Sequence, residues 1–122
     1  MGRRAVIVAG FGFREGAGVE SLADALAAAG GPAPEALATL PGKADHPAFA
    51  ALAHRLALPV RAVAPDRRAT LTQSPASLAI HGTGSVAEAT ALAAAGAHAR
   101  LLGPRAVSFD RMATCAIAVG DN

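Results

Sequence analysis

The sequence of 122 residues has no tryptophan, no tyrosine and only four phenylalanines. Proteins that bind nucleic acid by stacking bases need aromatic side chains on their surface, so this shortage argues against that role. The basic residues are scattered, with Arg3-Arg4 and Arg67-Arg68 as the adjacent pairs, and the formal net charge is only +2. Neither feature predicts a nucleic-acid partner.

Cysteine and long apolar runs are also scarce. The single cysteine, Cys115, excludes an internal disulfide, is typical of a reducing compartment and sits in an apolar run that predicts burial. No stretch reaches the roughly 20 apolar residues of a membrane span. The short run after Arg3-Arg4 has no convincing cleavage site of a signal peptide. We therefore expect a cytoplasmic protein with no membrane partner.

Metal-binding patterns are missing as well. The histidines are far apart, and none has a second ligand at metal spacing; they are His46, His54, His81 and His98. We therefore predict no metal site and no cofactor.

What the chain does have is an apolar content of 52%, much of it alanine, in short runs separated by glycine and proline. Residues 5–9, 36–40, 60–64, 99–102, 106–109 and 113–119 are predicted strands. Helical spacing of apolar residues predicts one helix that ends at Gly30-Gly31 and another that ends at Pro59. A third, amphipathic helix runs from Ser85 to Gly96, and a short helix fits within residues 65–81.

Two helix starts have candidate capping residues. Ser21 with Asp24 could cap the first helix, and Asp45 could cap the second. The order of elements predicts one domain, residues 1–122, of the α/β class. We expect a mixed, mostly parallel sheet flanked by helices, with antiparallel strands contributed by the C-terminal part.

The most informative feature is a pair of glycine-bearing turns that each lead into a predicted helix. They are Gly10-Phe11-Gly12-Phe13-Arg14-Glu15-Gly16-Ala17-Gly18 and Gly82-Thr83-Gly84-Ser85-Val86-Ala87-Glu88. Helix starts offer unpaired N–H groups, and glycine lets a ligand approach the backbone closely. The turns predict a site for a negatively charged ligand, with Gly10, Gly12, Gly82, Thr83, Gly84 and Ser85 as candidate contacts. The alternative is that these glycines serve only tight turns.

Known nucleotide motifs do not fit the first turn. Glu15 replaces the third glycine of a dinucleotide fingerprint, and no Gly-Lys-Ser/Thr of a phosphate loop follows. In the second turn, Ser85 and Glu88 form a capping box; alternatively, Glu88 points into a cleft. Arg14 and Lys43 both follow predicted strands, at the sheet edge where α/β proteins bind ligands, although both could be ordinary solvated cations.

Taken in order, several stretches resemble the CobE/CbiG C-terminal-domain family of cobalamin (vitamin B12) biosynthesis. The specific ones are Ser85-Val86-Ala87-Glu88-Ala89 and Thr114-Cys115-Ala116-Ile117-Ala118, supported by Val8-Ala9-Gly10-Phe11-Gly12-Phe13-Arg14, Leu40-Pro41-Gly42-Lys43, Leu58-Pro59-Val60 and Ser74-Pro75-Ala76-Ser77. The chain looks like a small stand-alone member, similar to the C-terminal domain of cobalt-precorrin-5A hydrolase. It departs from the family at His46, where a glutamate is usual, and at Phe13, where a cysteine is common.

We consider three functional hypotheses, of which the resemblance implies the first two. In the first, the protein binds a polycarboxylate precorrin or corrin intermediate as an accessory or carrier, with other enzymes of the pathway as further partners. Arg14 and Lys43 suit the carboxylates of such a ligand. In the second, the protein is a hydrolase that opens a precorrin lactone and releases acetaldehyde, with Glu88 as base and Lys43 as electrostatic stabiliser. The third is a nucleotide- or phosphate-binding regulatory module.

Overall fold

Two nine-residue strands, β1 (Ala5–Phe13) and β6 (Ala113–Asp121), form the centre of the sheet in the computed structural model, which describes residues 5–65 and 70–121. They pair antiparallel over their whole length, with Ala5 opposite Asp121 and Phe13 opposite Ala113. On the other side of β1 lie β2 (Ala36–Thr39) and then β3 (Val60–Ala62), both in parallel register. Beyond β6 lie two short antiparallel strands, β4 (Arg100–Leu101) and β5 (Ala106–Val107). The mixed sheet is thus confirmed, although its longest ladder is antiparallel.

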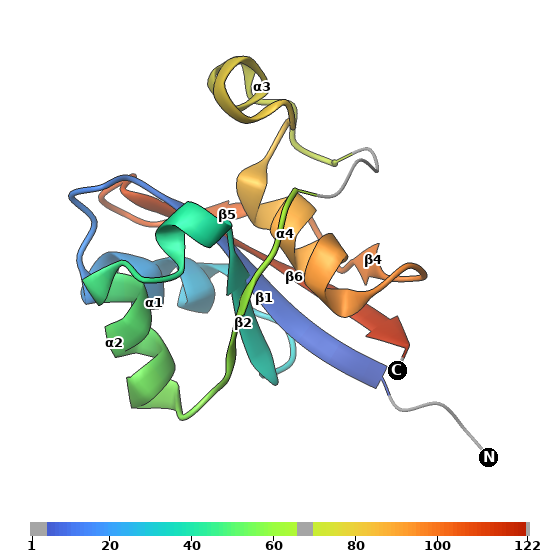
Figure 1. Ribbon diagram of the computed structural model, residues 1–122, viewed down its shortest axis with the longest axis horizontal. Helices are drawn as coiled ribbons and strands as arrows, with labels where there is room; N and C mark the ends of the chain where they lie inside the picture. The colour runs from blue at the N-terminus through green and yellow to red at the C-terminus, as the bar shows by residue number, and fades with distance from the viewer. Residues whose placement is uncertain (1–4, 66–69, 122) are drawn as a thin grey trace.

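Helices cover both faces of this open sheet (Figure 1). The helices α1 (Val19–Ala29) and α2 (Pro47–Leu56) pack on one face, and α4 (Val86–Ala95) packs on the other. A short 3-10 helix, η1 (Pro41–Lys43), precedes α2. The helix α3 (Pro75–His81) stands away from the sheet, above the start of α4, and none of its residues is buried. None of the helices in the described ranges is long and apolar enough to cross a membrane.

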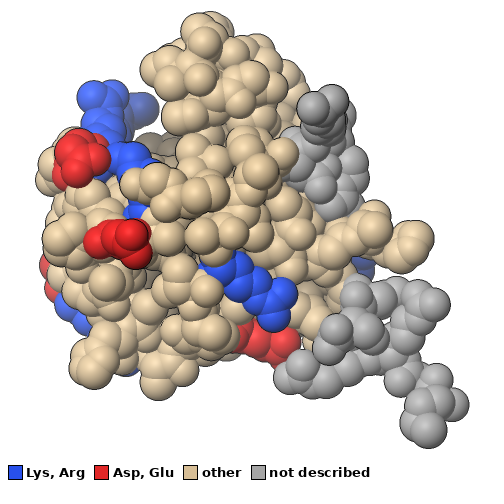
Figure 2. Space-filling model, in the orientation of Figure 1, with Lys and Arg blue, Asp and Glu red and all other residues tan. Residues whose placement is uncertain are grey.

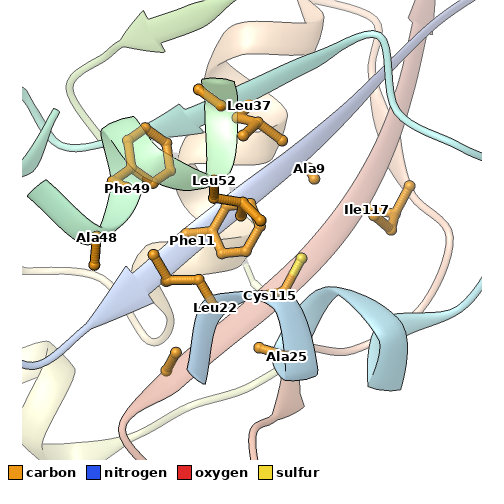
Figure 3. Packing of buried hydrophobic residues seen from close by; sticks show 12 residues of the cluster. Ala9, Phe11, Leu22, Ala25, Leu37, Ala48, Phe49, Leu52, Cys115 and Ile117 are labelled. Carbon is orange, nitrogen blue, oxygen red and sulfur yellow. The ribbon is translucent and has the colours of Figure 1, made fainter. Parts of the chain in front are cut away.

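The face covered by α1 and α2 holds the larger hydrophobic core. Phe11 of β1 meets Phe49 of α2 edge-on, with ring centroids 5.7 Å apart, and Leu22 of α1 closes the cluster (Figure 3). Cys115 is fully buried there, as its apolar run predicts, and burial raises the pKa of its thiol. The thiol is therefore an inert packing group rather than a nucleophile.

The cluster on the face covered by α4 has no phenylalanine and consists mainly of alanine and valine, with Leu92 as its largest buried side chain. A Cβ atom on Gly10 would lie 2.2 Å from the Ala87 carbonyl oxygen, and one on Gly120 would lie 2.0 Å from that of Ala95. The backbone of α4 can therefore rest directly on β1 and β6. Because the sheet covers one side and loops cover the other, α4 is buried on nearly every side. The prediction of an amphipathic helix here is wrong.

The structure also corrects the predicted helix caps. Gly18, with no side-chain cap, precedes α1, because Ser21 and Asp24 bind the distant loop at Phe109 and Asp110 instead. His46 caps α2, because its Nδ1 accepts a hydrogen bond from the Ala48 amide at 3.1 Å, so the predicted cap at Asp45 is one residue too early.

Strand lengths differ from the prediction as well. β1 continues past the predicted end at residue 9 to Phe13, because β6 pairs with it throughout, whereas β3 stops at Ala62. The basic pairs Arg3-Arg4 and Arg67-Arg68 lie outside the described residues.

The tight contact between β1 and α4 gives a direct test of the packing. We expect Gly10→Ala to lower the free energy of unfolding by about 1–3 kcal/mol or more, because its methyl group would overlap helix backbone that cannot move aside. Urea unfolding measures the loss. Gly42→Ala is the control, since its Cβ meets nothing within 4 Å. Equal stability of the Gly10→Ala protein and the wild type would refute this account.

Candidate functional site

A cavity of about 420 Å³ opens at the carboxyl end of β1. Gly12 and Phe13 of β1 form its floor together with the amino end of β6, and Val86 borders it at the start of α4. The helix α3 forms one wall, and the segment that contains β5 forms another. The cavity thus lies at the sheet edge where the sequence predicts a ligand, and its volume is within the usual range for small-molecule sites, roughly 300–1,000 Å³.

Three arginines from separate segments line this cavity. Arg14 follows β1, Arg105 precedes β5, and Arg111 lies in the turn before β6. Within the described residues, none of their guanidinium groups has a hydrogen bond or an ion pair. Arg55 and Arg61, by contrast, bind Glu20 and the Ala94 carbonyl. The cavity therefore offers unpaired positive charge.

The wall formed by α3 brings apolar side chains to the cavity. Ile80 lines the cavity with 73% of its surface exposed, and Ala76 lies one turn earlier. In Figure 2 the lobe of α3 carries no charged side chain, and Lys and Arg side chains lie beside its base. The Ser77 hydroxyl oxygen, also in this wall, is the one buried side-chain oxygen without a partner in the described part of the chain.

The turn that carries Arg111 is held rigidly by Asp110. The Asp110 carboxylate accepts hydrogen bonds from Ser108 Oγ at 2.6 Å, from Ser21 Oγ at 2.5 Å and from the Met112 amide at 3.0 Å. These donors, Ser108 first and Ser21 next, lower the pKa of Asp110 because they bind its charged form. Arg111 itself has a left-handed backbone with φ of 62°. The turn is therefore fixed before any ligand arrives.

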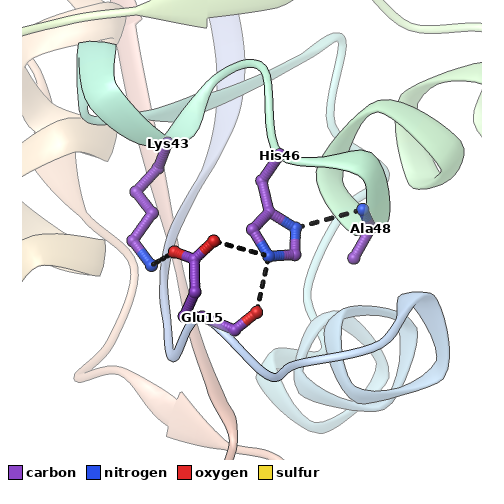
Figure 4. Close-up of polar contacts among 4 residues, drawn as sticks. All are labelled: Glu15, Lys43, His46 and Ala48. Atoms are coloured by element: carbon purple, nitrogen blue, oxygen red, sulfur yellow. Dashed lines mark hydrogen bonds and ion pairs between the residues drawn. The ribbon is translucent and has the colours of Figure 1, made fainter.

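Lys43 lies beside the cavity but does not line it. Its Nζ atom forms an ion pair with Glu15 at 3.2 Å (Figure 4). The same atom sits 4.9 Å from the centre of the Phe13 ring. His46 contacts the same loop, because its Nε2 donates to the Glu15 carbonyl oxygen at 2.7 Å while its Nδ1 caps α2. Lys43 thus has an anionic partner, whereas Arg14 has none among the residues that the structure describes.

The second glycine turn packs against protein rather than facing the cavity. A Cβ atom on Gly84 would lie 2.3 Å from the Thr72 carbonyl oxygen, and Ser85 is fully buried with its hydroxyl capping α4. Gly82 ends α3 with φ of 70°, and Thr83 is also buried. Of the predicted ligand contacts, Gly12 and Arg14 line the cavity, whereas Gly10, Lys43 and residues 82–85 do not.

Glu88, the predicted base, is fully buried in the first turn of α4. Its amide donates to Ser85 Oγ at 3.2 Å, which confirms half of the capping box. Its carboxylate binds the Thr72 and Arg105 amides instead of returning to Ser85. Glu88 is not among the residues that line the cavity.

Sequence reasoning missed Arg105, Arg111 and His81, all of which line the cavity. A signal for Arg111 was available. An antiparallel last strand begins at the edge where β1 ends, so Asp110-Arg111, directly before β6, had to lie near Arg14. Arg105 and His81 had no such signal, because their positions depend on how irregular segments pack.

The fold and the cavity define an α/β protein with an open mixed sheet and a cation-lined site at the carboxyl end of its first strand. Over residues 7–118 the chain matches the family described as "Cobalamin synthesis G C-terminus". It belongs to this family of cobalamin-biosynthesis proteins, as the motifs in the sequence imply.

Two solved structures support the assignment. The crystal structure of CobE, a protein from the cobalamin (vitamin B12) biosynthetic pathway, has 35% sequence identity and a TM-score of 0.81; the match covers 94% of this chain and 90% of that one. The cobalamin biosynthesis protein chiG from Agrobacterium tumefaciens str. C58 has 40% identity and a TM-score of 0.68, with 93% and 97% covered. No curated protein sequence matches the chain significantly.

The turn at Asp110 gives a pH-dependent prediction. Because the pKa of Asp110 is lowered in the folded protein, its charged form stabilises the fold above the unfolded pKa, and this contribution is lost as the pH falls through the folded pKa. We expect Asp110→Asn to lower the melting temperature at pH 7, and the gap to the wild type to shrink below about pH 4. A gap that stays constant from pH 7 to pH 3 would contradict this role.

Proposed function

We propose that the chain binds a polycarboxylate precorrin or corrin intermediate in the cavity at the end of β1, as an accessory or carrier protein of cobalamin biosynthesis. The observation that carries the proposal is a set of three arginines around one cavity whose guanidinium groups have no partner among the described residues, together with exposed apolar side chains in the same cavity. A corrin-type ligand has a flat, largely apolar ring with carboxylate arms, and the two sides of the cavity suit these two parts.

The energetics favour such a ligand over a neutral one. A hydrogen bond between a guanidinium group and a carboxylate gives about 1.5–3 kcal/mol, and to make it the arginines need not break an ion pair with any residue that the structure describes. Ser77 Oγ adds a buried polar atom without a partner in residues 5–65 and 70–121. Ile80 and Val107 are already exposed, so a ring that covers them removes apolar surface from water.

Binding without chemistry accounts for the geometry better than hydrolysis. Lactone opening needs a base that reaches an attacking water. Glu88 does not line the cavity, and both of its carboxylate oxygens accept hydrogen bonds from the chain. Lys43 likewise has Glu15 as its partner. This arrangement supports a binding role for the site.

Titration with hydrogenobyrinic acid, followed by its visible absorbance, tests the proposal. We expect Arg14→Gln, Arg105→Gln and Arg111→Gln each to raise the Kd about tenfold or more, because each removes one charge-assisted contact. Affinity of the wild type should fall as salt is added. The same corrin with its carboxylates converted to amides should bind far more weakly.

Arg100→Gln is the matched control, because Arg100 lies on β4, outside the cavity, and the substitution removes the same charge. Its Kd should equal that of the wild type. An absorbance spectrum that does not change with wild-type protein would overturn the proposal, as would three arginine variants that bind like Arg100→Gln. Stabilisation by nucleotides but not by tetrapyrroles would favour a nucleotide-binding module instead.

A further inference from the structure

The carboxylate of Glu88 joins two loops that are far apart in the sequence. The Thr72 amide donates to Oε1 at 2.9 Å, and Thr72 Oγ1 donates to Oε2 at 2.5 Å. The Arg105 amide donates to the same Oε2 atom at 2.8 Å. A buried carboxylate is costly unless such donors surround it, and the N-terminal turn of α4 adds a favourable dipole. The carboxylate of Glu88 therefore has all of its hydrogen-bond donors only while both loops are in place.

These two loops lead into two different walls of the cavity. Thr72 comes just before Ser74, which caps α3 and whose amide donates to the Gly84 carbonyl oxygen at 2.8 Å. Since α3 has no buried residue, its place over the cavity depends on such anchors rather than on core packing. On the other side, Arg105 itself lines the cavity. One buried carboxylate thus fixes both the apolar wall and one of the cations.

We infer that Glu88 is a positioning residue: it sets the place of α3 relative to Arg105 and thereby gives the cavity its shape for a ligand. This inference rests on the proposed function, because the shape matters only if the cavity binds something. It assigns Glu88 no contact with the ligand and no proton transfer. It also explains why a carboxylate, with acceptors only, stands at this position, where all its partners are donors.

Glu88→Gln tests the inference without a change of size. An amide has one acceptor oxygen, so its NH₂ group must face either the Thr72 amide or the Arg105 amide, and one of these bonds is lost. We expect the Kd for hydrogenobyrinic acid to rise about tenfold. Hydrogen exchange at the Thr72 or the Arg105 amide should accelerate by a similar factor.

Thr90→Val is the matched control. Thr90 is fully buried on the same helix, and its hydroxyl donates to the Val86 carbonyl oxygen at 2.7 Å, so the variant loses a buried hydrogen bond without touching either loop. We expect it to lose stability but to bind the corrin with the wild-type Kd. Wild-type affinity in Glu88→Gln, or equal losses of affinity in both variants, would overturn the inference.

The wild-type protein gives an independent test should Glu88→Gln fail to fold. Its Thr72 and Arg105 amides should exchange at least tenfold more slowly than the amide of Leu71, a neighbouring residue with 60% of its surface exposed, whereas equal rates would refute the link. This measurement needs no ligand. If the wild type binds no corrin, the proposed function fails, but the exchange experiment still tests whether Glu88 links the two loops. If the wild type binds the corrin and Glu88→Gln binds it equally well, only the present inference fails.

Discussion

The rest of the structure depends on the direct contact between the backbone of α4 and the central strands. Gly10 and Gly120 have no side chains to hold the helix away, so the backbone of α4 at Ala87 and Ala95 rests directly on β1 and β6. The helix face toward the sheet is correspondingly small, with Ala91 and Ala95 buried there. This packing is why a chain rich in alanine and poor in aromatics can bury a complete helix.

A helix buried on nearly every side has consequences for its polar residues. Ser85, Glu88 and Thr90 lie within about two turns and are all fully buried, and each must find its partner inside the protein. Ser85 and Thr90 bind the backbone of their own helix, whereas Glu88 binds two loops outside it. The tight packing that puts Glu88 inside thereby ties the irregular segments 70–74 and 102–105 to the sheet. The positions of the cavity walls therefore depend on the close contact of α4 with β1 and β6.

The sequence predicts the regular part of this architecture because local patterns determine it. The apolar run at the start of β1, the helical spacing before Gly30 and the capping serine at Ser85 each act within a few residues. Features that depend on distant partners could not be read in this way. The predicted capping role of Ser21 is wrong because its partner, Asp110, is 89 residues away. The hydrogen-bond partners of Glu88 could not be predicted either, because they lie in the least regular segments.

Partners that are distant in the sequence also decide which cations belong to the site. Lys43 was a natural candidate from its place after a strand, but Glu15 and the Phe13 ring already occupy its ammonium group. The guanidinium groups of Arg14, Arg105 and Arg111 have no such partners in the described part of the chain, although Asp24, Asp110 and Glu88 lie in the segments that support the cavity. Those carboxylates are all engaged by backbone amides or hydroxyls. The nearby acids thus help to build the walls of the cavity, and in the proposed function the three arginines bind the carboxylates of the ligand. The turn at Arg111 is the clearest example of an acid that holds a wall of the cavity in place. A left-handed backbone is unfavourable for arginine, and the hydrogen bonds around Asp110 hold the turn in that conformation.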